Sequence, residues 1–391
     1  MSQVITRTVW ILSLVSLLTD TASEMLYPIM PLYLKSIGFS IMVIGVLEGV
    51  AEATAGLSKG YFGKLSDTTQ KRMPFVQLGY ALSAISKPLM ALFLTPLWIF
   101  FVRTLDRLGK GLRTGARDAV LSDEATLQTK GKIFGFHRSM DTIGAVLGPL
   151  LALLYLQWHP HDYKTLFFIA FAPGLLSVGC SLLLKDKHVI RKPLASKPGF
   201  FSFFGYWKQS PDLYKKLVAG LLLFTLFNSS DVFLLLKVKQ SGLNDSDVIT
   251  VYIFYNLVFA AFAFPVGIFA DKIGLKRTFI IGLFIFAIVY GSMTFANQLH
   301  HYYILFFLYG IYAAATEGIS KAWISNISAK EDTATAIGTY SAFQSICTML
   351  ASSLAGFLWF QFGPVVIFFL SALMALVAGA YIAFIPYRVK Q

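Results

Sequence analysis

Apolar stretches of about twenty residues recur along the whole chain, and this repetition constrains the fold more than any other feature. A helix of about twenty apolar residues crosses the roughly 30 Å of hydrocarbon in a bilayer. The chain has 391 residues, of which 56% are hydrophobic and only 14% are charged. A soluble protein carries roughly a quarter charged residues. The sequence therefore predicts an all-α membrane protein that crosses the bilayer many times.

We predict twelve membrane-spanning helices from these stretches. The first contains Asp20 and Glu24 and lacks a small-residue cleavage site. We therefore interpret it as a helix of the mature protein and not as a secretory signal. The expected bounds of the twelve spans are 9–34, 41–63, 74–94, 96–117, 133–157, 164–184, 214–239, 246–270, 277–297, 301–323, 334–359 and 364–386.

The distribution of Lys and Arg predicts how the chain is oriented and divided. The formal net charge is +13. With both termini in the cytoplasm, the cytoplasmic segments hold most of these cations, as the positive-inside rule requires. The basic segment 185–213 is then a cytoplasmic linker between an N-terminal six-helix bundle, 1–184, and a C-terminal one, 214–391. The expected location is the inner (cytoplasmic) membrane. The outer loops hold Lys35, Lys164, Lys237 and Lys239.

One motif occurs twice, about half the chain apart. GKLSDTTQKR follows the second span and GIFADKIGLKR follows the eighth. Glycine lets two helices approach closely, and an aspartate near a helix end can bind cations across the turn. We expect a latch that forms in one conformation and breaks in another. The predicted latch residues are Gly63, Asp67, Arg72, Gly267, Asp271 and Arg277.

The two copies resemble the G-x-x-x-D-[RK]-x-G-[RK]-[RK] signature of the major facilitator superfamily. The second copy is the more complete, because Thr68 and Gln70 replace the basic residue and the glycine of the first. The resemblance covers the whole chain. It implies the major facilitator fold, with two six-helix bundles around a central cavity and substrate bound near the midplane. The alternative is a pair of ordinary basic cytoplasmic turns.

The fourth span carries a stripe of charge in the sequence RTLDRLGKGLRTGARD. At about 100° per residue, Arg103, Arg107 and Lys110 share one face with Asp106. An Arg at the bilayer centre costs about 2.5–3.5 kcal/mol, so this face should meet protein or a water-filled cavity. We predict that its cations bind substrate. The alternative is a structural ion network in which Asp106 and Asp141 neutralise them.

This segment also resembles the fourth-span motif of the family, R-x-x-Q-G-x-G-x-G. In the family that arginine is associated with proton coupling or substrate binding, which implies such a role for Arg103. Asp106 and Arg107 depart from the usual Gln and Gly. In the fifth span, Gly144 to Pro149 (GAVLGP) resembles the core of an antiporter-associated motif that allows close helix packing. It favours export.

Other spans contribute polar side chains with inward spacing. Buried carboxyl groups can exchange protons near neutral pH, so we assign proton coupling to several acids. Further substrate contacts are expected from Tyr27, Arg138 and Glu317. The predicted proton-coupling residues are Asp20, Glu24, Glu48, Glu52 and Asp141.

Together these features predict a proton-coupled secondary active transporter of a small anionic or zwitterionic organic solute, working as an exporter by alternating access. The alternatives are multidrug efflux of lipophilic cations and export of a metal or metal chelate. No Cys/His cluster with ligand spacing supports a resident metal. No P-loop, G-x-S-x-G or H-E-x-x-H motif supports an enzyme. The expected partners are the substrate, protons and lipid, without a cofactor or nucleic acid, and the protein is expected to be a monomer.

Overall fold

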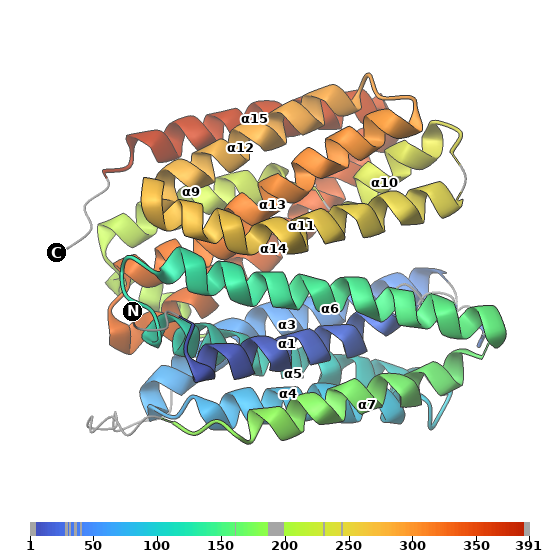
Figure 1. Ribbon diagram of the computed structural model, residues 1–391, viewed down its shortest axis with the longest axis horizontal. Helices are drawn as coiled ribbons and strands as arrows, with labels where there is room; N and C mark the ends of the chain where they lie inside the picture. Colours follow the sequence, from blue (N-terminus) through green and yellow to red (C-terminus); the bar gives the residue numbers. More distant parts are fainter. Residues whose placement is uncertain are drawn as a thin grey trace. The chain divides into compact units, whose positions relative to one another are not determined.

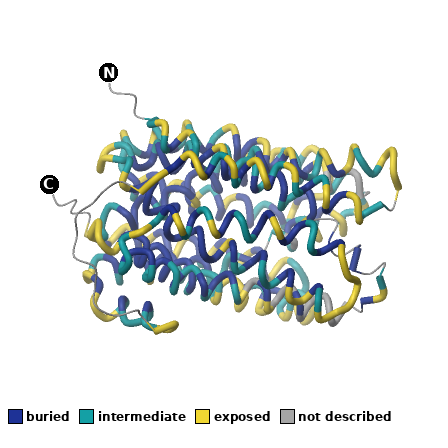
Figure 2. The backbone as a smooth tube through the Cα atoms, turned by 90° about the horizontal axis from the view of Figure 1, so that it is seen from below, coloured by how far each residue is buried: buried dark blue, intermediate teal, exposed yellow. Residues whose placement is uncertain are grey.

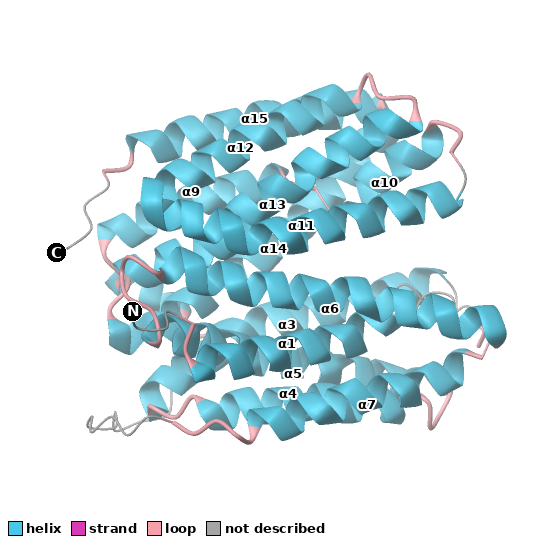
Figure 3. Ribbon diagram, in the orientation of Figure 1, coloured by secondary structure: helices cyan, strands magenta, loops and turns pink. Residues whose placement is uncertain are grey.

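The structure, a computed structural model, is built from helices connected by short loops (Figure 3). It describes residues 5–27, 30, 33–34, 37–39, 41–160, 162–186, 199–229, 231–243 and 245–386. No strand occurs within these ranges. The helices are α1 (Arg7–Leu26), α3 (Ile41–Thr69), α4 (Met73–Met90), α5 (Pro96–Asp123), α6 (Lys130–Trp158), α7 (Tyr163–Ser181), α8 (Phe204–Gln209), α9 (Asp212–Phe227), α10 (Asp231–Gln240), α11 (Asp245–Ile273), α12 (Leu275–Met293), α13 (Leu299–Ile327), α14 (Thr333–Phe362) and α15 (Pro364–Phe384).

Most predicted spans coincide with one helix each, but two do not. The first span, 9–34, extends beyond α1, which ends at Leu26, and the seventh is divided. The prediction of a continuous helix over 214–239 is wrong, because α9 ends at Phe227 and α10 begins at Asp231. Asn228, Ser229 and Ser230 precede that aspartate. Such side chains compete for backbone hydrogen bonds and favour helix ends. Among the described residues, eight helices are long and apolar enough to cross a membrane.

Sequence-local rules account for several helix ends. Prolines at the first position of α5 and α15 (Pro96 and Pro364) need no backbone donor there. Thr6 caps α1 by accepting a hydrogen bond from the backbone N–H of Val9 at 3.3 Å. Gly274 separates α11 from α12 with a φ of 100°, a conformation that other residues rarely adopt.

The chain forms two compact units. Unit 1 comprises Met1–Glu124, Met140–Gln209 and Ala329–Ala342, and unit 2 comprises Ala125–Ser139, Ser210–Ser328 and Phe343–Gln391. In unit 1, α5 packs against α3 and α4, and α7 packs against α1 and α4. In unit 2, α13 packs against α11 and α12, and α15 packs against α12 and α9 (Figure 1). The first turns of α6 belong to unit 2 and the first turns of α14 to unit 1.

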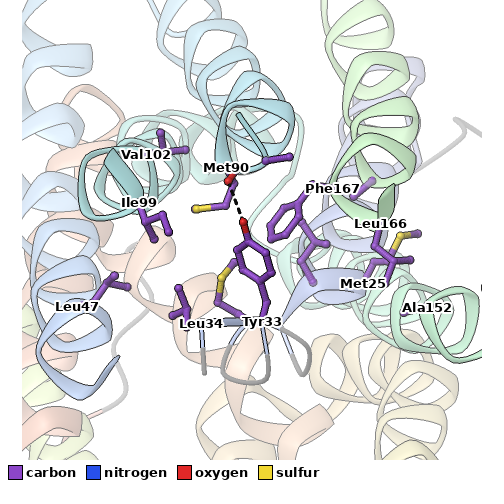
Figure 4. Close-up of a cluster of buried hydrophobic side chains, with 14 of the residues drawn as sticks. Met25, Tyr33, Leu34, Leu47, Met90, Ile99, Val102, Ala152, Leu166 and Phe167 are labelled. Atoms are coloured by element: carbon purple, nitrogen blue, oxygen red, sulfur yellow. Dashed lines mark hydrogen bonds between the residues drawn. The ribbon is translucent and has the colours of Figure 1, made fainter. Parts of the chain in front are cut away.

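Unit 1 contains an apolar core between α1, α4, α5, α6 and α7 (Figure 4). The Tyr33 hydroxyl donates to the carbonyl oxygen of Met90 at 3.5 Å, and its ring meets the edge of Phe167. Large apolar side chains such as Trp158 and Phe384 are more than four-fifths exposed. Exposed residues recur along the outer helices (Figure 2). A soluble protein would cover so much apolar surface, and here lipid would cover it.

Candidate functional site

Two glycines of α6 set its close approach to α1 in unit 1. A Cβ atom on Gly144 would lie 2.4 Å from the carbonyl oxygen of Leu17, and one on Gly148 would lie 2.6 Å from that of Thr21. Both contacts are with backbone, so only glycine fits at these positions. The G-x-x-x-G spacing places both glycines on one face of α6.

This approach brings two acids together inside the unit. Asp20 of α1 and Asp141 of α6 share a side-chain hydrogen bond. The Ser16 hydroxyl also donates to Asp141, which is 7% exposed. Glu24 and the exposed side chain of Lys110 act electrostatically on Asp20. The structure therefore brings together three of the predicted proton-coupling residues and one predicted substrate-binding cation.

A lysine that was not among the predicted site residues pairs with the acid of the α5 charge stripe. The ammonium group of Lys87, in α4, donates to Oδ1 of Asp106 at 2.8 Å and is almost wholly buried. Arg103 lies 3.6 Å from the other carboxylate oxygen. Ser86 donates to the same Asp106 at 3.2 Å. This part of the stripe is an ion network of the kind weighed as the alternative to substrate binding.

The remaining cations of the stripe have different surroundings. Arg107 is 9% exposed and still acts electrostatically on Asp106, whereas Lys110 is exposed. Arg113 donates to the Ser83 hydroxyl at 2.7 Å and stacks over the ring of Tyr80. Arg117 pairs with Asp118 at 2.8 Å. Lys110 is therefore the stripe residue with the most accessible charge.

Unit 2 holds its own polar cluster. Arg138, on α6, forms an ion pair with Glu317 of α13, and both side chains are partly exposed. The Arg138 guanidinium also lies 5.0 Å from the centre of the Phe259 ring. These two predicted substrate-binding residues are thus partners of each other.

A second acid of unit 2 sits where the seventh span is interrupted. Asp231 is the first residue of α10, and its Oδ1 accepts a hydrogen bond from the Tyr309 hydroxyl at 2.7 Å. Asn228, just after α9, donates to the Tyr312 hydroxyl at 3.1 Å. Asp231 lies within the predicted seventh span but was not among the predicted site residues. The polar run from Asn228 to Asp231 was the available signal.

The first latch aspartate caps a helix from the far end of the sequence. Oδ2 of Asp67 accepts hydrogen bonds from the backbone N–H and the hydroxyl of Thr335, at 2.6 and 2.8 Å. Thr335 lies in the first turn of α14, where N–H groups lack helical partners. A Cβ atom on Gly63 would lie 2.4 Å from the carbonyl oxygen of Ala334, so the motif glycine permits this contact.

Asp67 lies beyond the predicted end of the second span, and it also meets a cation of its own motif. Arg72 approaches Oδ1 of Asp67 at 3.5 Å and pairs more closely with Asp123, at 3.1 Å. Burial nevertheless raises the pKa of the Asp67 carboxyl to about 7. Its charge therefore changes near neutral pH.

The second latch aspartate repeats this arrangement within unit 2. The Asp271 carboxylate accepts from the backbone N–H groups of Gly131 and Lys132, at 2.8 and 2.7 Å, in the first turn of α6. A Cβ atom on Gly267 would lie 2.3 Å from the carbonyl oxygen of Gly131. Arg277, the motif's last cation, is exposed. Both copies of the motif therefore cap a helix that belongs to the other half of the sequence.

The remaining predicted site residues are Tyr27, Glu48 and Glu52. Tyr27 follows the end of α1 and is 51% exposed. Glu48 and Glu52 lie in α3, but their side chains are outside the described part of the structure. Across the described residues, no three His, Cys, Asp or Glu side chains gather as metal ligands would.

The chain is similar in sequence to known membrane transporters. The profile of the Major Facilitator Superfamily matches residues 12–254 and 233–391. An uncharacterized MFS-type transporter of Methanocaldococcus jannaschii is 32% identical over 97% of this chain and 95% of its own length. A multi-drug resistance efflux pump PmrA homolog of Lactococcus lactis is 22% identical over 86% of this chain and 85% of its own.

Solved structures share the fold at low identity. The human organic anion transporter MFSD10 aligns with a TM-score of 0.81 at 16% identity, covering 96% of this chain and 99% of its own. The fucose:proton symporter of E. coli aligns at 0.79 and 13% identity, covering 97% and 98%. The expected fold is confirmed.

Proposed function

Because the chain belongs to the Major Facilitator Superfamily, we propose that it is a proton-coupled secondary active transporter that exports a small anionic or zwitterionic organic solute by alternating access. Membership makes the chain a membrane transporter and not an enzyme. Proton coupling, the class of solute and the direction are the proposal.

The observation that carries the proposal is the carboxyl pair of Asp20 and Asp141. An ionised carboxylate accepts hydrogen bonds but cannot donate one. We propose that the pair shares one proton, because two ionised carboxylates this close would repel each other. When that proton leaves, two negative charges face each other in a buried place, which strongly favours recapture of a proton.

Lys110 links this proton to the binding of an anion. It acts electrostatically on Asp20, and its own side chain is exposed. Loss or gain of the shared proton changes the negative charge beside Lys110 and therefore the free energy with which an anion binds there. Arg107, one turn away along α5, adds positive charge on the same side of the helix.

The two latches supply an element that can open and close. Asp67 and Asp271 each cap the first turn of a helix from the other half of the sequence. In alternating access, one bundle rocks against the other around the substrate. We propose that each cap forms in one conformation of the transport cycle and breaks in another. The export direction is favoured by the GAVLGP segment of α6.

Proteoliposomes loaded with a pH-sensitive dye would test the proposal. Addition of a panel of small organic anions and zwitterions should move protons for at least one solute, and Asp20→Asn or Asp141→Asn should abolish that movement. Lys110→Ala should weaken the apparent affinity for the solute, whereas Lys215→Ala, which alters a partly exposed cation in unit 2, should not. A panel that moves no protons, or variants as active as the parent, would refute the proposal.

Multidrug efflux of lipophilic cations is the second candidate. The relative from Lactococcus lactis is named for multi-drug efflux, and the acid Asp231 lies among tyrosine rings in unit 2. Ethidium efflux from the same proteoliposomes, without any response to organic anions, would favour this function.

A further inference from the structure

The interruption of the seventh span exposes polar groups within an apolar unit. α9 ends at Phe227 and α10 begins at Asp231. Non-helical backbone at membrane depth is tolerated where it is buried in protein or lines a cavity, and transporters place such breaks at their binding sites. The side-chain oxygen of Asn228 is buried there and accepts no hydrogen bond from the described residues.

Asp231 brings a negative charge to this interruption. Its recorded partner is the Tyr309 hydroxyl, at 2.7 Å. No cationic side chain of the described residues lies within 4.0 Å of its carboxylate, and the nearby Arg138 is paired with Glu317. These three charged groups therefore sum to one negative charge. Asp231 is partly buried, and a carboxylate shielded from water without a cation is costly, which makes this position attractive to a cation from outside the chain.

Tyrosine rings gather around the same acid. The Tyr309 ring centre lies 5.0 Å from that of Tyr255, 5.2 Å from that of Tyr312 and 6.3 Å from that of Tyr290. These four rings come from α11, α12 and α13, the helices labelled in Figure 1, and each ring residue is at most 5% exposed according to its surface area. The faces of aromatic rings attract cations, and groups of them recognise quaternary ammonium ligands.

We propose that Asp231, with the rings of Tyr309, Tyr255, Tyr312 and Tyr290, binds the ammonium group of the transported solute. The inference rests on the proposed function and narrows it to the zwitterionic class, because a purely anionic solute offers nothing to this cluster. A proton alone would neutralise Asp231, but it would make no use of four surrounding rings. An alkylated or quaternary ammonium uses both the charge and the rings.

Matched ligand pairs would test this subsite on the purified full chain. Glycine betaine and 3,3-dimethylbutanoate differ only in carrying a cationic nitrogen or a neutral carbon, and so do choline and 3,3-dimethylbutanol. Titrations followed by tryptophan fluorescence should show about tenfold or greater preference for at least one ammonium member. Asp231→Asn should remove that preference and Asp231→Glu should retain part of it. Tyr309→Phe should keep most of it, whereas Tyr309→Leu should lose much of it.

The control is Asp212→Asn, the same substitution at an exposed acid at the start of α9, which should leave the preference unchanged. Equal or absent binding of both members in each pair would overturn the inference. A preference for the ammonium member that survives in Asp231→Asn would also overturn the inference. This holds even if that variant loses its proton flux. The titration needs no pH gradient. A preference for the ammonium member without proton movement would therefore refute the proposed proton coupling but support this subsite. Proton movement without that preference would support the coupling and refute the subsite.

Discussion

Substitution of Gly144 by alanine would test what holds the carboxyl pair of unit 1 together. The added Cβ would lie 2.4 Å from the carbonyl oxygen of Leu17, whereas ordinary contact begins at 3.4 Å. The obstacle is backbone, so no side-chain rotation relieves it, and α1 and α6 must separate by about 1 Å. Asp141 lies one turn before Gly144 on the same face of α6. The hydrogen bond between Asp20 and Asp141 should therefore lengthen past its useful range.

The expected cost has two parts. Overpacking a tight contact costs about 1–3 kcal/mol, and losing a hydrogen bond to a charged group costs about 1.5–3 kcal/mol. Gly144→Ala should therefore unfold at a clearly lower temperature in detergent and lose proton-coupled flux in proteoliposomes.

Gly179→Ala provides the matched control, because a Cβ atom there would meet nothing within 4 Å. Gly179 lies in the last turn of α7, so this change should stabilise the protein slightly, by at most about 0.5 kcal/mol. If Gly144→Ala instead unfolds at the parent temperature and keeps its pH-dependent flux, the close approach of α1 and α6 is not what maintains the pair.

Three further outcomes follow from the described contacts. Lys87→Met removes the nearest cation of the buried Asp106 carboxylate and leaves Arg103 at 3.6 Å, so it should cost about 1.5–3 kcal/mol in chemical unfolding; unchanged stability would contradict the ion network. The pKa of Asp67 is raised from 3.8 to about 7, so its stabilising contribution is complete below about pH 4 and is lost as the pH rises through 7. Thermal unfolding at several pH values should show the parent losing stability relative to Asp67→Asn over that range, and parallel curves would refute the assignment. Asp271→Ala removes the acceptor for two backbone donors of α6 and should cost about 1 kcal/mol, seen as faster hydrogen exchange at Gly131 and Lys132; unaltered exchange would argue against the cap.

Helix positions were the most predictable part of this protein. The length of an apolar stretch and the polar residues that end it are local properties of the sequence. The predicted span 96–117 begins where α5 begins, at Pro96. The repeated motif also identified the glycines and aspartates that make the close contacts. It could not identify what they contact. Thr335 offers a backbone N–H, and nothing in a residue's identity shows which distant helix will begin beside Asp67.

The candidate sites were predictable only in part. Lys87 is a lone charge in an otherwise apolar stretch, and its pairing with Asp106 depends on how α4 rotates against α5. The carboxyl pair likewise depends on the crossing of α1 and α6. The interruption before Asp231 was marked by a polar run, but the surrounding apolar length outweighed it. The ring cluster comes from three helices and has no signature in any one of them.

The exchange of helix ends between the two units has a consequence for how the protein is made. Unit 1 includes Ala329–Ala342, so this unit cannot be completed until most of the chain has been synthesised. Until then Gly63, Gly115 and the Lys59 carbonyl, which contact Ala334 and Gly338 of α14, have no partner to pack against. Nascent chains expose such surfaces to misassembly. A truncated chain that stops before Ala329 should therefore be a preferred client of insertases and membrane quality-control proteases, even though it contains every helix of the first half.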